Sequence, residues 1–418
     1  MAFRNFSALS AGILSVRKLL LSFGFVGILV TGWSDSARAI PAVTYVTGES
    51  SGADVIFRIE FDTEIPLSGV ATIAVTDSRM LSLDGIDYVP GTSDTEVVVG
   101  MPPRKIGHFD VSAGTVLADY ISDTDAIDAS TPPPVPNSWP SSILVTDTHF
   151  YYVENQFGFG TTTDHRIIRR AFAGGAEELV FDGVATAPFL EGEELENFEG
   201  LEQVDLGEQD GIRLFFFAED PFSPPDRWLV SIGLVGGVWD GMEPFIELDG
   251  LTGSPLLGGA DELDYDPFSQ LLFGTNIITG EIIAYDPVIS EAFVPPGGTP
   301  PFFISPAQVL SGATDGLGLL GLEIDGIRSD ESGRMVFSGR GGVVGAFDIA
   351  SIGTSGATDA AVYALVLDPS LTFDDLTPMT PPLPPILVPA ANPWGLLVLA
   401  VLLLSSGLYA SRVRNLYK

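Results

Sequence analysis

Acidic residues recur near the start of four similar stretches of this sequence, and they are the residues best suited to chemistry. The stretches are LSLDGIDYVPGTSDTEVVVG (81–100), FEGLEQVDLGEQDGIRLFFFA (198–218), GADELDYDPFSQLLFGT (259–275) and LEIDGIRSDESGRMVFSG (322–339). Carboxylates held within a few ångströms raise one another's pKa unless a cation intervenes, and oxygen-rich sites favour Ca²⁺ or Mg²⁺. We therefore expect a calcium site if the fold brings these acids together: Asp84, Asp87, Glu199, Glu202, Asp261, Glu262, Asp264, Glu323 and Asp325. The alternative is that they are solvated turn residues in a chain that is acidic throughout.

Other catalytic chemistry finds little support. The chain has no cysteine, which excludes thiol catalysis, disulfides and cysteine-ligated metals. His108, His149 and His165 lie in separate segments without metal-ligand spacing, and we expect His165 at the surface. GESSG (48–52) has the G-x-S-x-G pattern of a nucleophile elbow, but a strand-like segment follows it instead of a helix, so a tight hairpin is favoured. SDTDAID (122–128) resembles part of a calcium loop, yet it lacks the required glycine and is better explained as a linker.

Each acidic stretch continues into a second strand-like piece: RKIGHFDV, RWLVSIGL, GEIIAYDP and GVVGAFDI. Alternating apolar positions and turn residues are strand signals, and helical periodicity is nearly absent from 41 to 370. Two further stretches, 43–63 and 143–183, fit the same unit, which makes six units with a period near that of propeller blades. We therefore predict an all-β fold, a six-bladed β-propeller over 40–377, with a pair of β-sandwiches as the rival. DAAVYALVLDP (359–369) is expected to return to the N-terminal unit and close the ring.

The unit at 143–183, with Phe150-Tyr151-Tyr152, Ile167-Ile168-Arg169-Arg170 and Gly174-Gly175, resembles blades of YWTD-type six-bladed propellers. In a propeller the equivalent positions of successive blades converge at one mouth of the central channel. The acid-rich channel also makes the chain similar to phytase-like and lactonase-like propellers. That resemblance implies a metal that activates water or polarises an ester oxygen.

The two ends predict where the protein goes. Arg17 and Lys18 precede an apolar stretch of signal-peptide length, and a small-x-small site at Ala37 and Ala39 predicts cleavage of a signal peptide at 1–39. The alternative is an uncleaved anchor helix. A proline-rich linker (378–393) leads to an apolar run long enough to cross a bilayer, and basic residues follow it within 394–418. We expect the body of the protein to be exported.

Pro389, then Trp394 and Gly395, a leucine-rich span and a basic tail resemble the IPTL-CTERM sorting signal of Gram-negative bacteria. The resemblance implies a transmembrane sorting helix, an inner-membrane intermediate and an exosortase-like sorting protease as a partner, followed by the cell envelope, the cell surface or the medium. A permanent single-span anchor is the alternative.

Two classes of function remain open. The formal net charge of −36 repels nucleic acid, so a nucleic-acid partner is not expected. The first class is a surface-displayed propeller that binds a partner or a glycan. The second is a secreted calcium-dependent hydrolase of phosphoesters, esters or lactones. A hydrolase should gather its acids in one pocket beside a basic residue, for which Arg328, Arg334 and Arg340 are the candidates, whereas a display protein should have dispersed acids and a shallow channel.

Overall fold

The computed structural model describes residues 42–62, 68–78, 80, 83–101, 105–121, 138–156, 165–207, 211–219, 227–247, 260–277, 280, 282–288, 291–292, 303–304, 323–330, 333–349, 352–353, 356–357 and 362–378. The predicted signal peptide, the SDTDAID loop and the sorting segment with Pro389, Trp394 and Gly395 lie outside these residues. Within them, no helix is both long enough and apolar enough to cross a membrane.

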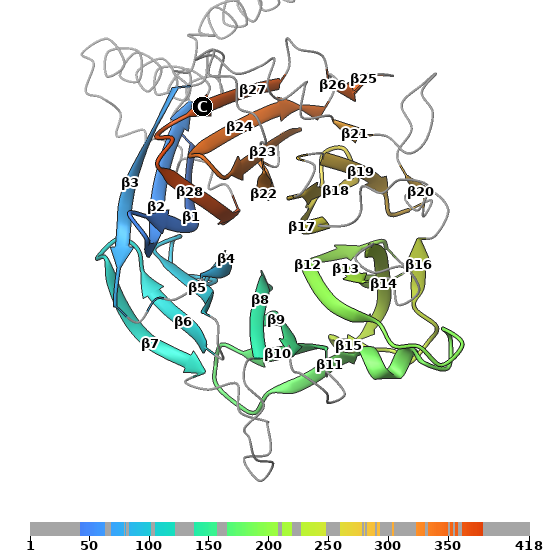
Figure 1. Cartoon of the computed structure of the whole chain (residues 1–418). Coiled ribbons are helices and arrows are strands. Elements are labelled where there is room, and N and C mark those ends of the chain that lie inside the picture. Colours follow the sequence, from blue (N-terminus) through green and yellow to red (C-terminus); the bar gives the residue numbers. More distant parts are fainter. Residues whose placement is uncertain are drawn as a thin grey trace, which may run out of the picture. The chain divides into compact units, whose positions relative to one another are not determined.

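Six antiparallel sheets of four or five strands surround a central channel, as Figure 1 shows. This arrangement confirms the predicted six-bladed β-propeller and contradicts the pair of β-sandwiches. From the innermost strand outward, blade 1 holds β28 (Leu371–Leu376), β1 (Ala42–Ser50), β2 (Ala53–Asp62) and β3 (Ser68–Thr76); blade 2 holds β4 (Asp84–Tyr88), β5 (Glu96–Met101), β6 (Lys105–Asp110) and β7 (Thr115–Ile121); blade 3 holds β8 (Ser138–Val145), β9 (His149–Gln156), β10 (Arg166–Ala171) and β11 (Glu178–Asp182).

The second half repeats the same plan with short additional strands. Blade 4 holds β12 (Glu196–Asp205), β13 (Ile212–Glu219), β14 (Arg227–Val235) and β15 (Val238–Trp239), with β16 (Phe245–Glu247) also paired to β14; blade 5 holds β17 (Ala260–Asp266), β18 (Leu271–Asn276), β19 (Ile282–Asp286) and β20 (Glu291–Ala292), with β21 (Phe303–Ile304) also paired to β19; blade 6 holds β22 (Ile324–Ser329), β23 (Arg334–Gly339), β24 (Val343–Asp348) and β27 (Val362–Val366). β25 (Ile352–Gly353) and β26 (Gly356–Ala357) pair with each other, and a 3₁₀ turn, η1 (Gly183–Thr186), leads from blade 3 to blade 4.

The ring is closed by a different strand from the one that the sequence suggested. The DAAVYALVLDP segment forms β27, which pairs with β24 as the outer strand of blade 6. The next strand, β28, pairs with β1 and completes blade 1 from the inside. The reason is packing: Phe373 of β28 is fully buried and its ring meets Phe57 edge-on at 5.1 Å, whereas Leu365 of β27 is only partly buried. Pairing the first and last strands removes the open edge of blade 1 toward the channel.

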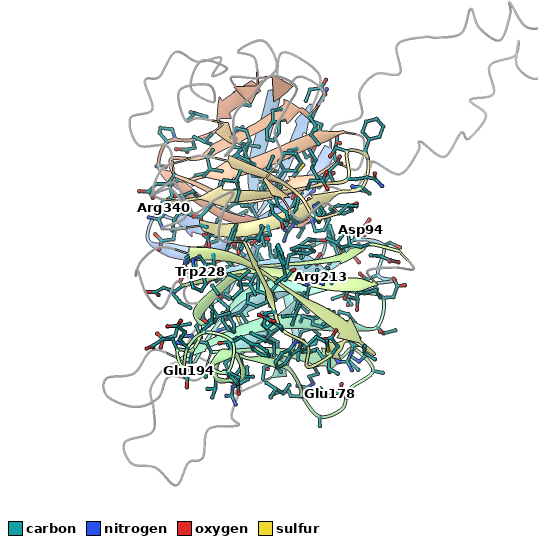
Figure 2. All side chains as sticks on the ribbon, turned by 90° about the vertical axis from the view of Figure 1, so that its right-hand side faces the viewer. Asp94, Glu178, Glu194, Arg213, Trp228 and Arg340 are labelled. Atoms are coloured by element: carbon teal, nitrogen blue, oxygen red, sulfur yellow. The ribbon has the colours of Figure 1, made fainter. Side chains whose placement is uncertain are left out.

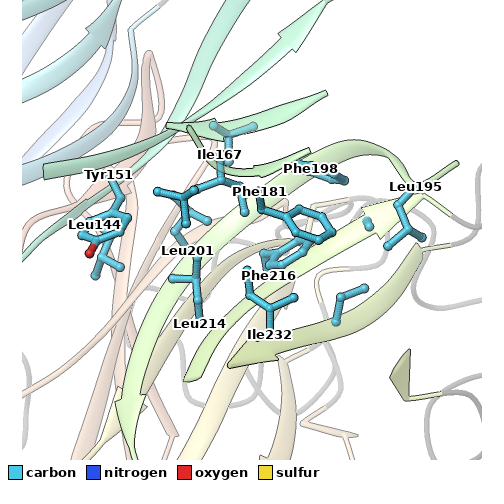
Figure 3. Close-up of a cluster of buried hydrophobic side chains, with 14 of the residues drawn as sticks. Leu144, Tyr151, Ile167, Phe181, Leu195, Phe198, Leu201, Leu214, Phe216 and Ile232 are labelled. Atoms are coloured by element: carbon cyan, nitrogen blue, oxygen red, sulfur yellow. The ribbon is translucent and has the colours of Figure 1, made fainter. Parts of the chain in front are cut away.

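The hydrophobic core lies between neighbouring blades. Figure 3 shows the cluster between blades 3 and 4, where Phe181, Phe198 and Phe216 lie with ring centroids 5.0–5.7 Å apart. All three are almost fully buried, and tilted aromatic pairs add to the free energy gained from burial. Phe216 of β13 belongs to this cluster, and its neighbours Phe215 and Phe217 are buried on the other face of the blade, against blade 5.

The inner strands all run in the same direction, from the end of the channel that we call the mouth to the opposite end. The GESSG segment confirms its predicted hairpin at the mouth: Ser51 and Gly52 form the β1–β2 turn with φ of 55° and 76°. These positive φ angles are typical of a two-residue hairpin turn. A nucleophile elbow would require a helix directly after the turn, whereas β2 follows here, so Ser50 is not placed as a nucleophile.

Candidate functional site

The six inner strands share a four-residue segment in which a buried aliphatic residue occupies the third position. The segments are Asp84–Asp87, Ser141–Leu144, Glu199–Glu202, Asp261–Asp264, Asp325–Arg328 and Asp374–Thr377. Each contains or adjoins an irregularity in the pairing with the second strand of its blade. A β-bulge inserts one extra residue and redirects neighbouring side chains, so strict alternation does not apply at these positions.

The first positions form an upper ring at the mouth: Asp84, Ser141, Glu199, Asp261, Asp325 and Asp374. Its five carboxylates line one pocket of about 500 Å³ together with Glu49 and Asp54 of blade 1. Arg227 and Arg340 are the basic residues of that lining. Seven acidic side chains therefore share the pocket with two basic ones.

Burial and mutual repulsion raise the pKa values of the upper ring. Burial raises the pKa of Glu199 to about 8, with the charge of Asp261 adding to the effect and Arg227 opposing it. Burial is also the main cause that holds the pKa of Asp84, Asp325 and Asp374 well above the usual range, and neighbouring carboxylates raise it further. A hydrogen bond between Asp325 and Asp261 adds to the rise for Asp325. Burial and repulsion thus favour the protonated form of these carboxyl groups, whereas a bound cation would favour the ionised form.

The second positions explain how the bulges are tolerated. Gly85, Ser142 and Gly200 have φ of 58°, 47° and 59°, and a Cβ on Gly200 would lie 2.4 Å from the carbonyl oxygen of Asp261. Two blades carry acids at this position instead, Glu262 and Asp375, whose side chains hydrogen-bond each other. These two carboxyl groups extend the acidic cluster beneath the upper ring.

The fourth positions form a lower ring: Asp87, Leu144, Glu202, Asp264, Arg328 and Thr377. Arg328 is almost fully buried, and its Nη1 lies 2.5 Å from Glu262 Oε1 and 3.6 Å from Asp264 Oδ1 while donating to the carbonyl oxygen of Leu263 at 3.0 Å. Burial raises the pKa of Asp87 to about 6 and that of Asp264 to about 7, and Arg328 limits both rises. One guanidinium thus neutralises part of a buried acidic ring.

Several of these acids also connect neighbouring blades. Asp375 Oδ2 accepts a hydrogen bond from the Gly85 amide at 2.5 Å, and Asp87 Oδ2 accepts one from the Val145 amide at 2.8 Å. Asp264 Oδ2 accepts one from the Ser329 amide at 2.5 Å. Since each bond joins successive inner strands, these carboxylates have a structural role whether or not the channel binds a ligand.

The two arginines of the pocket are engaged at its rim. Arg340 Nη1 lies 2.8 Å from Glu323 Oε2, and its Nε lies 3.9 Å from Asp325 Oδ2. Arg227 Nη2 lies 3.9 Å from Glu199 Oε1, and its Nη1 donates to the carbonyl oxygen of Ala260. Both guanidinium groups already offset acids of the site.

The structure places the nine predicted acids in four positions. Asp84, Glu199, Asp261 and Asp325 meet in the pocket; Asp87, Glu202 and Asp264 form the lower ring, with Glu262 between; and Glu323 sits outside, paired with Arg340. Sequence reasoning missed Asp374 and Asp375, because their strand lies at the very end of the predicted domain, after the sixth unit. The Asp-Asp-Leu order of LTFDDLTP matches Asp-Gly-Ile and Glu-Gly-Leu of other blades and would have identified them.

His165 is buried, which contradicts its expected place at the surface. Its Nδ1 lies 3.0 Å from Asn155 Oδ1, and burial lowers its pKa to about 4. Asn155 in turn accepts a hydrogen bond from the Phe198 amide and donates one to the carbonyl oxygen of the same residue. The neutral imidazole thus belongs to a polar connection between blades 3 and 4.

Among the residues that the structure describes, no three Asp, Glu or His side chains are arranged to hold a metal ion. Calcium binding would require side chains to move and shared protons to leave. The expectation of calcium ligation at these acids therefore stays a prediction.

Fold and site together define a class: a six-bladed β-propeller with an acidic channel mouth. Similar solved structures include the nidogen–laminin complex, with 13% identity, a TM-score of 0.49 and coverage of 80% of this chain and 97% of that chain. A luciferin-regenerating enzyme has 10% identity, a TM-score of 0.42 and coverage of 71% and 80%. A structural genomics protein from Bacteroides thetaiotaomicron has 12% identity, a TM-score of 0.42 and coverage of 79% and 78%. These are likenesses of fold. No family model and no curated protein matches the sequence.

Proposed function

We propose that this chain is an exported, non-enzymatic β-propeller that binds a partner by taking a positively charged group into the mouth of its channel. The observation that carries the proposal is the convergence of seven acidic side chains, against two arginines, in one pocket of about 500 Å³. That volume fits a lysine or arginine side chain or a small amine, and it is larger than a lone ion needs.

The electrostatics of the pocket support this choice. Raised carboxyl pKa values mean that the pocket disfavours its own negative charge. A cation favours the ionised form and displaces protons, so affinity for a basic group should rise with pH through about 8, the pKa of Glu199. Calcium is the second cation to consider, since the ligands would be oxygen atoms.

Titration calorimetry on the full chain tests the proposal, with a tetralysine peptide and CaCl₂ as separate probes at pH 7.5. We expect heat with the peptide, together with proton release detected as a dependence on the ionisation enthalpy of the buffer. The matched variant is Asp84→Asn with Asp374→Asn, which keeps shape and removes charge. A neutral tetraserine peptide is the control. Absence of heat with both cations at millimolar concentration would contradict the proposal.

The terminal segments supply the location in this proposal. The signal peptide would direct export and be removed by cleavage after Ala39. Sorting through Pro389, Trp394 and Gly395 by an exosortase-like protease would then carry the propeller from the inner membrane to the envelope, the surface or the medium. Cell fractionation of the tagged chain with and without Trp394→Ala tests this, and an unchanged distribution would argue against the sorting signal.

A calcium-dependent hydrolase of phosphoesters, esters or lactones is the second candidate. It is favoured by one observation: acids and arginines share one pocket instead of being dispersed, which is the arrangement expected of a hydrolase. Against this candidate, Arg227 is paired with Glu199 and Arg340 with Glu323. An anionic substrate would have to displace these acidic partners to bind the arginines. Turnover of a phosphate or carboxylic ester that needs Ca²⁺ and disappears in Asp261→Asn would favour the enzyme.

A further inference from the structure

The outer strand of blade 1, β3, is the longest outer strand that the structure describes, and it contains no ionisable residue. One edge of β3 pairs with β2, and the other edge has no partner strand among the described residues. Figure 1 shows β3 at the periphery of the propeller. An unpaired edge presents backbone N–H and C=O groups that can pair with another strand.

The other outer strands carry features that protect a sheet edge. β15, β16, β20 and β21 have two or three residues each, β7 carries Asp119 and β11 carries Glu178. β27 packs Leu365 against the core between blades 6 and 1. Short length, charge and cover are the usual ways of preventing a sheet edge from pairing with another chain. β3 has none of them along its first part, where Val70 is 61% exposed and Ile73 is 51% exposed.

The free part of β3 is its first six residues. A bulge at Ala74 interrupts the pairing with β2, because Ile73 and Val75 lie opposite successive residues of that strand. The β6–β7 turn approaches the same point, since a Cβ on Gly114 would lie 3.0 Å from the carbonyl oxygen of Ala74, and Val75 is buried. The segment open to a partner strand is therefore Ser68–Ile73.

The charge of the protein favours a second copy of the chain as that partner. The formal net charge is −36, and Figure 2 shows acids at both ends of the channel, with Glu194 on the side of the mouth and Asp94 on the opposite side. Two copies therefore repel each other end to end. A cationic partner would be attracted to those ends, whereas the uncharged strand lets a second copy approach with little repulsion.

The sequence of the segment also fits a copy of itself. A two-fold axis at the centre of an antiparallel pair places each residue opposite its symmetry mate on the same face of the sheet. With the axis at Ala71, that residue lies opposite itself, Gly69 lies opposite Ile73, and Val70 lies opposite Thr72. The exposed Ile73 side chain then meets a glycine, which leaves room for it, and only alanine methyl groups meet at the axis.

We propose that β3 is a self-association surface, through which two copies of this chain pair antiparallel along Ser68–Ile73 and join their first blades into one continuous sheet. The pairing would cover Val70 and Ile73 and provide partners for the backbone groups of both edges. The surface lies at the periphery of the propeller and the acidic pocket at its channel, so this inference does not depend on the proposed binding function.

Sedimentation velocity on the full chain, in a non-ionic detergent that disperses its apolar ends, tests the proposal. We expect a dimer at micromolar concentration. Ile73→Lys, and Val70→Lys on the opposite face of the strand, should each raise the dissociation constant of the dimer at least about tenfold, because lysine on an edge strand opposes pairing. Leu179→Lys is the matched control, since Leu179 is also an exposed aliphatic residue on an outer strand, and it should leave the dimer intact. Circular dichroism checks that each variant is folded.

A monomeric wild-type chain, or an oligomer that both lysine variants of β3 leave intact, would overturn the proposal. Cross-linking tests the register, because the chain has no cysteine of its own. Ala71→Cys should form a disulfide-linked dimer on mild oxidation, since residues opposite each other have Cα atoms about 5 Å apart. Thr76→Cys is the control, because two such residues would lie roughly 30 Å apart. A dimer without a disulfide at position 71, or with one formed as readily at position 76, would overturn the pairing centred on Ala71.

Discussion

Replacing Arg328 by Met should destabilise the propeller strongly and in a pH-dependent way. The guanidinium is the cation nearest to Glu262 and Asp264, at 2.5 Å and 3.6 Å, and the side chains are 5%, 3% and 13% exposed. Removing one partner of a buried ion pair typically costs about 3–5 kcal/mol, because the other charge is left without compensation. We expect this loss in the free energy of unfolding at pH 8.

At pH 5 the loss should shrink to about 1–2 kcal/mol, the usual cost of a lost buried hydrogen bond, because the carboxyl groups can protonate. The pKa of Asp264 is already raised to about 7 by burial with Arg328 present, and removing the guanidinium raises it further. Urea unfolding at both pH values, followed by tryptophan fluorescence, measures the difference. Arg213→Met is the matched control, since Arg213 donates to the hydroxyl and the carbonyl oxygen of Ser231, which do not titrate, and its cost should not depend on pH. A loss below 1 kcal/mol at pH 8, or equal losses at both pH values, would refute this account of Arg328.

Three further predictions concern the protein without ligand. The carboxyl pKa values of about 6 for Asp87, 7 for Asp264 and 8 for Glu199 lie above the ordinary values of 3.8, 3.8 and 4.5. The folded state therefore binds more protons than the unfolded state between about pH 4 and 8, and its stability falls as the pH rises. Differential scanning calorimetry should show a melting temperature that falls from pH 5 to pH 8, and a rise would contradict these pKa shifts. Gly200→Ala should lower the free energy of unfolding in urea by at least about 2 kcal/mol, because a Cβ at φ 59° would collide with the Asp261 carbonyl oxygen. Gly207→Ala should lower it less despite a φ of 85°, because nothing lies within 4 Å of the added Cβ. Equal losses for the two variants would refute the steric argument. Phe373→Ala should cost about 3–5 kcal/mol by opening a cavity at the ring closure, and a cost under 1 kcal/mol would show that β28 does not hold the ring together.

Much of the fold could be predicted from the sequence, because each blade is a meander of strands that are close together in the chain. Paired strands, Gly-containing turns and alternating apolar positions lie close together in the chain, so the four acidic stretches were recognisable as repeats of β4–β5, β12–β13, β17–β18 and β22–β23. The closing strand was not predictable in the same way. β27 and β28 have similar strand patterns. Which of them pairs with β1 depends on contacts between residues more than 300 positions apart in the chain, such as Thr44 and Thr377.

By itself, the sequence determined that the chain is acidic, strand-rich and repetitive, and that acids precede the buried aliphatic residue of several inner strands. Only the tertiary structure decided which of those acids meet. Closing the ring brought Asp374 and Asp375 beside Asp84 and Asp261, and turned Arg328 into a buried counter-cation. The reason is physical: charge interactions in a channel depend on distance and burial, and both arise when six separate blades converge on one axis.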